Sequence, residues 1–192
     1  MNLPNKLTMG RMILILVFIF VYFINEVIGS SYIYILGGIF VIASLTDFFD
    51  GYYARKYNMI TTFGKFIDPL ADKLLVITAL MVLSNIYAIT GSGYSFWMPF
   101  WVVLIVIVRE LMVTSIRLVA MEDGLVLAAS QLGKAKTFVT MGMISYYFFL
   151  MPIDTSAIQI IGIVLVVLSV ILTVVSGIDY FMKNKTIITK SI

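Results

Sequence analysis

The chain has 192 residues, of which 61% are hydrophobic and only 12% are charged. Its mean hydropathy is +1.08, whereas soluble domains carry about a quarter of charged residues. The formal net charge is +3, and there is no Cys and no His. The composition predicts an integral membrane protein and excludes disulfides, thiol chemistry and imidazole ligands.

Uncharged stretches predict six membrane-spanning helices in a single domain that covers residues 1–192. A span needs about 20 apolar residues, so the stretch from Leu74 to Val108 is too long for one helix. We divide it at Thr90-Gly91-Ser92-Gly93, after which Trp97 and Trp101 follow as interfacial aromatic residues. Residues 1–10 are expected to form a short interfacial segment and 183–192 a basic tail. The expected helices are 11–26, 32–56, 64–89, 96–121, 134–152 and 155–182.

The basic residues predict the orientation in the membrane. All thirteen lie at the N-terminus, in the second-to-third or fourth-to-fifth connection, at the C-terminus, or at helix ends that face these segments. The remaining connections, near 26–31, 90–95 and 151–155, contain none. By the positive-inside rule, both termini and the second-to-third connection are expected to face the cytoplasm.

Four carboxylates flank the connection between the second and third expected helices: Asp47, Asp50, Asp68 and Asp72. The first two are three residues apart and the last two are four apart, so each pair would share one helix face. Asp50-Gly51 and the run from Tyr57 to Gly64 suggest a helix end and a turn. The two pairs are therefore expected to lie on neighbouring helices.

Clustered carboxylates in a membrane protein repel one another unless a cation neutralises them. Carboxylate oxygens suit Mg²⁺, Mn²⁺ or Ca²⁺, and two divalent ions balance four aspartates. Paired metal ions are a recurrent device for phosphoryl transfer. The sequence thus predicts a metal centre, the alternative being that the aspartates cap helix ends in water at the membrane surface.

The residues around the aspartates form a longer spaced pattern: Asp47-x2-Asp50-Gly51-x2-Ala54-Arg55-x8-Gly64-x3-Asp68-x3-Asp72. This pattern of eight fixed residues resembles the complete signature of the CDP-alcohol phosphotransferase family. The similarity extends to residues 2–11 and 109–137. The resemblance implies an all-α polytopic membrane protein with six transmembrane helices around a cytoplasm-facing polar cavity. It also implies transfer of the phosphatidyl group from CDP-diacylglycerol to an alcohol, with release of CMP.

The resemblance also implies roles for the residues of the motif. Asp47, Asp50, Asp68 and Asp72 would hold Mg²⁺ or Mn²⁺, as two ions, and Asp72 would be the general base for the attacking hydroxyl. The residues assigned to CDP-diacylglycerol are Asp50, Gly51, Ala54, Arg55, Gly64 and Asp68. The small residues would leave room for a cytosine ring or a phosphate, the alternative being close helix packing. The alternative for Arg55 is anchoring at the membrane interface.

Basic residues after the motif suggest that the acceptor alcohol carries a phosphate. Arg109 and Arg117 are eight residues apart, a little over two helical turns, so their heads are expected to converge on one anion. Together with Lys134 they favour glycerol 3-phosphate over serine or inositol, because an uncharged acceptor needs no second basic group. The expected product is phosphatidylglycerophosphate. Lys136 is a weaker candidate, and Glu110 would either orient an arginine or pair at the surface.

Thr8 and Arg11 are further candidates for binding the acceptor. Arg11 is equally compatible with a snorkelling anchor, whose charge reaches the membrane surface along its aliphatic stem.

Two other functions compete with this interpretation. In a cation carrier or channel, the aspartates would form a permeation site near the midplane, with a polar track through both halves of the membrane. The charges of this chain are instead confined almost wholly to the side expected to be cytoplasmic. A relative with another acceptor would make cardiolipin or an inositol phospholipid. The resemblance also implies a homodimer, and no nucleic-acid partner is expected.

Overall fold

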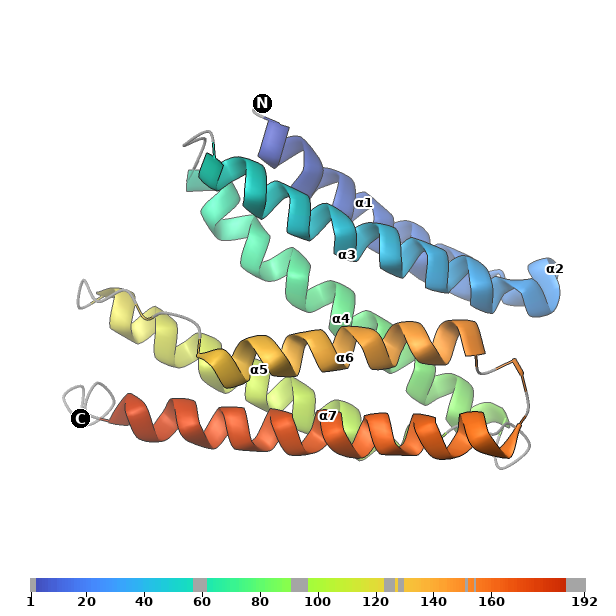
Figure 1. The fold of residues 1–192 in the computed structure, drawn as a ribbon. Coiled ribbons are helices and arrows are strands. Elements are labelled where there is room, and N and C mark those ends of the chain that lie inside the picture. Colours follow the sequence, from blue (N-terminus) through green and yellow to red (C-terminus); the bar gives the residue numbers. More distant parts are fainter. Residues whose placement is uncertain are drawn as a thin grey trace. The chain divides into compact units, whose positions relative to one another are not determined.

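The computed structural model describes residues 3–56, 62–90, 97–122, 127, 130–150, 152–153 and 155–185, and their side chains except at 3–5, 48–56, 62–69, 90 and 121–122. All secondary structure in these ranges is helical (Figure 1). There are six long helices and two short ones: α1 (Leu3–Phe23), α2 (Asn25–Ile28), the 3₁₀ helix η1 (Gly29–Ser31), α3 (Tyr32–Lys56), α4 (Thr62–Thr90), α5 (Phe100–Glu122), α6 (Gln131–Leu150) and α7 (Ser156–Lys183). The predicted all-α fold is confirmed.

The chain forms two compact units. Unit 1 comprises Met1–Leu83 and Ile144–Pro152, and unit 2 comprises Ser84–Met143 and Ile153–Ile192. In unit 1, α1 lies along α3, and in unit 2, α5 lies along α7 (Figure 1). Both α4 and α6 contribute residues to each unit.

Aromatic side chains fill the core of unit 1. The ring of Phe148 lies 5.8 Å from that of Phe18 and 6.4 Å from that of Phe40, between ring centroids. A Cβ atom at Gly37 would lie 2.9 Å from the Cβ of Phe148. Gly37 therefore lets the end of α6 approach α3 closely, as small residues do between membrane helices.

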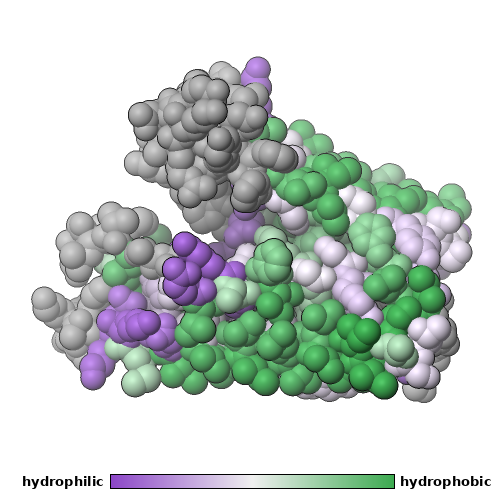
Figure 2. All heavy atoms as spheres, viewed as in Figure 1, coloured by the Kyte–Doolittle hydropathy of each residue, from purple (hydrophilic) through white to green (hydrophobic). Residues whose placement is uncertain are grey.

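In unit 2, α7 turns its small and polar residues inward: the buried positions are Gly162, Val166, Ser169, Thr173, Ser176, Gly177 and Tyr180. The hydroxyls of Ser169 and Thr140 lie 2.8 Å apart and join α7 to α6. The outer face is apolar, with Ile163, Val167, Ile171, Val174 and Ile178 among its exposed residues. Figure 2 shows hydrophobic residues covering this surface. An outward apolar face and an inward polar stripe suit a helix surrounded by lipid.

Four helical segments are long and apolar enough to cross a membrane: Lys6–Phe23, Asn25–Asp47, Leu70–Ile89 and Ser156–Lys183. The other two long helices, α5 and α6, are not among these segments, and both carry charged residues. The charged residues are Arg109, Glu110, Arg117 and Glu122 in α5, and Lys134 and Lys136 in α6. The chain is a membrane protein, while the membrane crossing of α5 and α6 stays a prediction.

Several helix ends differ from those predicted. The first helix starts at Leu3 rather than 11, so residues 3–10 are its first turns and not a separate segment. Pro4 is compatible with this because the N–H it lacks has no partner in a first turn. The helix also ends earlier, at Phe23, and the chain then forms α2 and η1, with Gly29 at φ +72°. The helix end suggested at Asp50-Gly51 is wrong, because α3 continues to Lys56.

The start of α6 has a local cause that the prediction missed. The backbone N–H of Gly133 donates to the Ser130 Oγ at 3.0 Å, so Ser130 is the N-cap of the helix. The helix therefore begins at Gln131 rather than 134. It ends at Leu150, two residues before Pro152, which cannot continue a helix.

Candidate functional site

The aspartate motif is distributed over two helices of unit 1. Helix α3 carries Asp47 and Asp50 one turn apart, and α4 carries Asp68 and Asp72 one turn apart. Both segments are helical, in agreement with the expected helices 32–56 and 64–89. The described side chains include Asp47 and Asp72. Side chains outside the described residues are those of Asp50, Gly51, Ala54, Arg55, Gly64 and Asp68.

Arg11 reaches the motif from α1. Its Nη1 lies 2.6 Å from the Oδ1 of Asp47, and the two side chains are 0% and 37% exposed. Thr8, three residues before Arg11, is also buried. The snorkelling interpretation of Arg11 is wrong, because the packing of α1 on α3 buries the guanidinium beside a carboxylate. A buried charge is tolerated when it is paired in this way.

The residues of the motif fit a hard divalent cation in their chemistry. All the candidate ligands are carboxylates, and the chain has no thiol or imidazole to favour a softer metal. Among the described side chains, which include two of the four aspartates, no group of three acidic residues is close enough to hold an ion. The metal centre therefore stays a prediction.

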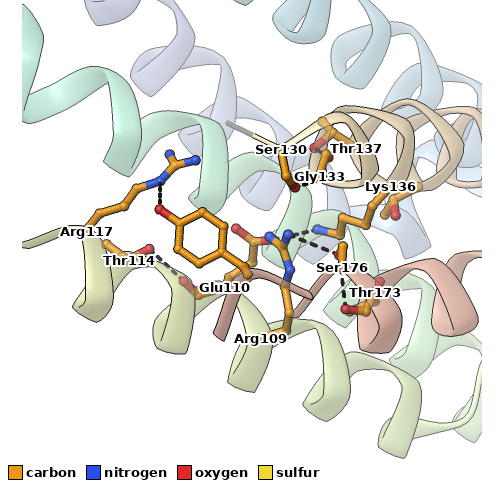
Figure 3. A network of polar contacts seen from close by, with 12 residues as sticks. Arg109, Glu110, Thr114, Arg117, Ser130, Gly133, Lys136, Thr137, Thr173 and Ser176 are labelled. Atoms are coloured by element: carbon orange, nitrogen blue, oxygen red, sulfur yellow. Dashed lines mark hydrogen bonds and ion pairs between the residues drawn. The ribbon is translucent and has the colours of Figure 1, made fainter. Parts of the chain in front are cut away.

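Unit 2 contains a second polar cluster, which we call the basic network: Arg109, Glu110, Lys136 and Ser176 (Figure 3). Arg109 Nη1 donates to Glu110 Oε1 at 2.9 Å, and Lys136 Nζ donates to the same oxygen at 2.6 Å. Arg109 Nη2 donates to Ser176 Oγ at 3.1 Å. The side chains of Arg109, Glu110 and Lys136 are 11%, 15% and 4% exposed. The network joins α5, α6 and α7 in a largely buried position.

Two glycines leave space for Arg109. A Cβ atom at Gly177 would lie 3.1 Å from the Cγ of Arg109, and one at Gly133 would lie 3.6 Å from its Nη2. The arginine thus passes between backbone positions of α6 and α7 that lack side chains. Its orientation is fixed by this close packing as well as by its hydrogen bonds.

Arg117 contacts α7 one turn after Ser176. Its Nε donates to the Tyr180 hydroxyl at 3.2 Å, and its Cζ lies 5.6 Å from the centre of the tyrosine ring. Tyr180 is buried with Val113 and Ile116 of α5, and Leu127 packs against this cluster. Both arginines are therefore held against one face of α7, although a shared anion stays a prediction.

The two candidate lysines of α6 differ in burial. Lys134, the preferred candidate, is exposed, whereas Lys136 is buried in the basic network. The contributions of Ser176 and Tyr180 were not predicted at all. A signal was present, because polar residues recur every three or four positions along the otherwise apolar α7.

Comparison with known proteins identifies the family. A family model described as CDP-alcohol phosphatidyltransferase matches residues 1–175. The CDP-diacylglycerol–glycerol-3-phosphate 3-phosphatidyltransferase of Bacillus subtilis (strain 168) is 41% identical, over 95% of either chain. The protein of the same name from Rickettsia typhi is 36% identical, over 96% of this chain and 98% of its own. A probable phosphatidylglycerophosphate synthase of Mycobacterium tuberculosis is 37% identical, over 93% of this chain and 79% of its own. The chain belongs to the CDP-alcohol phosphatidyltransferase family.

Proposed function

We propose that this protein transfers the phosphatidyl group of CDP-diacylglycerol to glycerol 3-phosphate, forming phosphatidylglycerophosphate and CMP. The observation that carries the proposal is the similarity, over almost the whole chain, to proteins named for this reaction. The basic network agrees with it, because two cations, Arg109 and Lys136, share the one carboxylate of Glu110 among the described contacts. Arg117 lies against α7 at Tyr180. Such an excess of positive charge suits an acceptor that carries a phosphate dianion.

The donor side of the reaction is assigned to the aspartate motif. We propose that Asp47, Asp50, Asp68 and Asp72 hold two divalent ions, Mg²⁺ or Mn²⁺. Bound ions would supply positive charge to the pyrophosphate of the liponucleotide and to the departing CMP. Asp72 would accept the proton of the attacking hydroxyl, since the chain has no histidine for this task. The remaining motif residues, Gly51, Ala54, Arg55 and Gly64, would contact CDP-diacylglycerol.

The acceptor side is assigned to Arg109, Arg117 and Lys134, as the sequence predicts, with Lys136 added because it is buried beside Arg109. Thr8 and Arg11 belong to unit 1. The contact of Arg11 with Asp47 favours a role beside the aspartates rather than at the acceptor phosphate.

The orientation and assembly are part of the proposal. We propose that both termini and the reaction site face the cytoplasm, since the basic residues gather in the segments expected there. We also propose a homodimer, as the family resemblance implies.

The test is an assay of the full-length protein in detergent micelles with CDP-diacylglycerol, Mg²⁺ and one acceptor at a time. We expect glycerol 3-phosphate to support release of CMP and formation of phosphatidylglycerophosphate, while serine and inositol do not. Turnover with serine or inositol alone would refute the assigned acceptor.

The same assay tests the metal centre. Asp68→Asn and Asp72→Asn should each abolish turnover, and excess chelator should do the same until Mg²⁺ or Mn²⁺ is added back. Full activity in chelator would refute the metal assignment.

A further inference from the structure

A single oxygen of Glu110 binds two cations from different helices. Glu110 Oε1 accepts from Arg109 Nη1 of the same helix and from Lys136 Nζ of α6 (Figure 3). Because both donors meet one atom, the two positive charges are held within a few ångströms of each other in a largely buried position. The carboxylate between the two cations offsets their mutual repulsion, which is stronger in a buried position than in water.

The other contacts of Arg109 do not replace this one. Its Nη2 donates to the hydroxyl of Ser176, which carries no charge, and its Nε is buried without a hydrogen-bond partner among the described residues. A Cβ atom at Gly177 would lie 3.1 Å from its Cγ, so the aliphatic part of the side chain packs against the backbone of α7. If Glu110 lost its charge, Lys136 would be repelled by Arg109, and Lys136 is the member that can move because its stem is flexible.

We propose that Glu110 is a positioning residue, which keeps Arg109 and Lys136 paired at the spacing that receives the phosphate of the acceptor. This inference rests on the proposed function and adds to it a residue that acts through others. If two cations are already held together, binding of a phosphate does not include the free-energy cost of bringing the two like charges close to each other. The alternative is that Glu110 merely lowers the positive charge of the cluster.

The two interpretations predict opposite changes in Glu110→Gln, which keeps the size of the side chain and removes its charge. If Glu110 positions the pair, the KM for glycerol 3-phosphate rises about ten-fold or more, while the KM for CDP-diacylglycerol is unchanged. If Glu110 only lowers the charge, the more positive cluster attracts the acceptor and its KM falls. An unchanged or lower KM would overturn the proposal.

A double-mutant cycle with Lys136→Gln tests the mechanism. Once Lys136 is neutral, Glu110 has no repulsion between the two cations to suppress. The acceptor KM of the double variant should therefore rise by less than the product of the two fold-changes in the single variants. Multiplicative effects would overturn the proposal. If the single variant Glu110→Gln does not fold, the double variant is used instead, because it contains no buried lysine without a carboxylate partner. Its acceptor KM is then compared with that of Lys136→Gln. The proposal then expects less than about a three-fold difference in acceptor KM, and a difference of about ten-fold or more overturns it.

Asp179→Asn is the matched control, because Asp179 pairs with Lys183 at 2.9 Å in the same unit but on the exposed side of α7. Its acceptor KM should equal that of the wild type.

The acceptor that the wild type uses separates a failure of this inference from a failure of the proposed function. If another phosphorylated acceptor is used instead of glycerol 3-phosphate, the function is wrong and the same comparison is made with that acceptor. A wild type that uses an acceptor without phosphate overturns both.

Discussion

At the level of single residues, the two buried charges among the described side chains, Arg11 and Lys136, are paired between helices. Arg11 of α1 meets Asp47 of α3 in unit 1, and Lys136 of α6 meets Glu110 of α5 in unit 2. Removing one member of such a pair leaves the other as an uncompensated charge, which destabilises more than the pair itself stabilises. These residues are therefore the ones at which a small change has the largest expected effect.

Arg11→Ala should lower both the melting temperature and the activity. The substitution leaves Asp47 without the cation at 2.6 Å, and we expect an activity loss of about ten-fold or more. Thermal unfolding in detergent and the CMP-release assay measure the two effects. Lys6→Ala, which removes an exposed cation from the same helix, is the control. A melting temperature equal to that of the control would show that the pair contributes nothing to stability.

Gly177→Ala should disturb Arg109 without changing any charge. The added methyl group would lie 3.1 Å from the arginine Cγ, so the side chain has to shift by a few tenths of an ångström. We expect the KM for glycerol 3-phosphate to rise about three-fold or more, since the position of the guanidinium is altered. Gly142→Ala is the control in α6, because a Cβ there meets nothing within 4 Å. Equal kinetics for the two variants would contradict the packing argument.

At the level of helices, the apolar pattern predicts that each long helix exists, but it predicts the first and last residues of these helices less accurately. The predicted segment 32–56 coincides with α3, because its apolar run is bounded by polar connections on both sides. The predicted start of the first helix lies eight residues after that of α1, because the uncharged stretch begins only after Arg11, whereas α1 contains both Arg11 and the exposed Lys6. The start of α6 depended on the cap at Ser130, which is visible in the sequence once a capping residue is sought.

The polar partners were harder to predict than the helices. The sequence identified Arg109, Arg117 and Glu110 as relevant, because charges are rare in such helices. It did not identify Asp47 as the partner of Arg11, since that choice depends on how α1 packs along α3. Burial likewise separates Lys136 from Lys134, and it follows from the face of α6 that meets α5 and α7.

Two adjacent glycines of α3 give a matched test of helix packing. Gly37→Ala should destabilise unit 1 by about 1–3 kcal/mol through overpacking, because the new Cβ would lie 2.9 Å from the Cβ of Phe148. Gly38→Ala meets nothing within 4 Å and should be neutral or slightly stabilising, since alanine favours a helix. Thermal unfolding of the two variants measures the difference. Equal melting temperatures would contradict the close approach of α6 to α3.

At the level of the whole molecule, the surface resembles the interior of a soluble protein. Large apolar side chains are exposed on all six long helices, from Leu16 of α1 to Ile171 of α7. Water would make such a surface unfavourable by about 25 cal/mol for each Å² of apolar area. A bilayer removes this cost, so the same exposed apolar side chains that surround the fold also determine that its surroundings are lipid.

The absence of cysteine allows a direct test of orientation. Single cysteines can be introduced at Ser30 of η1 and at Lys185, both of which are exposed. With both termini in the cytoplasm, a membrane-impermeant maleimide should label Ser30→Cys in intact cells and Lys185→Cys only after the membrane is opened. Labelling of Lys185→Cys in intact cells would reverse the proposed orientation.

The hydroxyls inside α7 bear on how this helix enters the membrane during synthesis. The Thr173 hydroxyl donates to the Ser169 carbonyl at 2.7 Å, and the Ser176 hydroxyl donates to the Thr173 carbonyl at 3.2 Å. Both hydroxyl donors have their acceptors within α7, so neither needs a hydrogen-bond acceptor from another helix. The nascent segment can therefore leave the translocon alone, and its assembly with earlier helices becomes a later, reversible step.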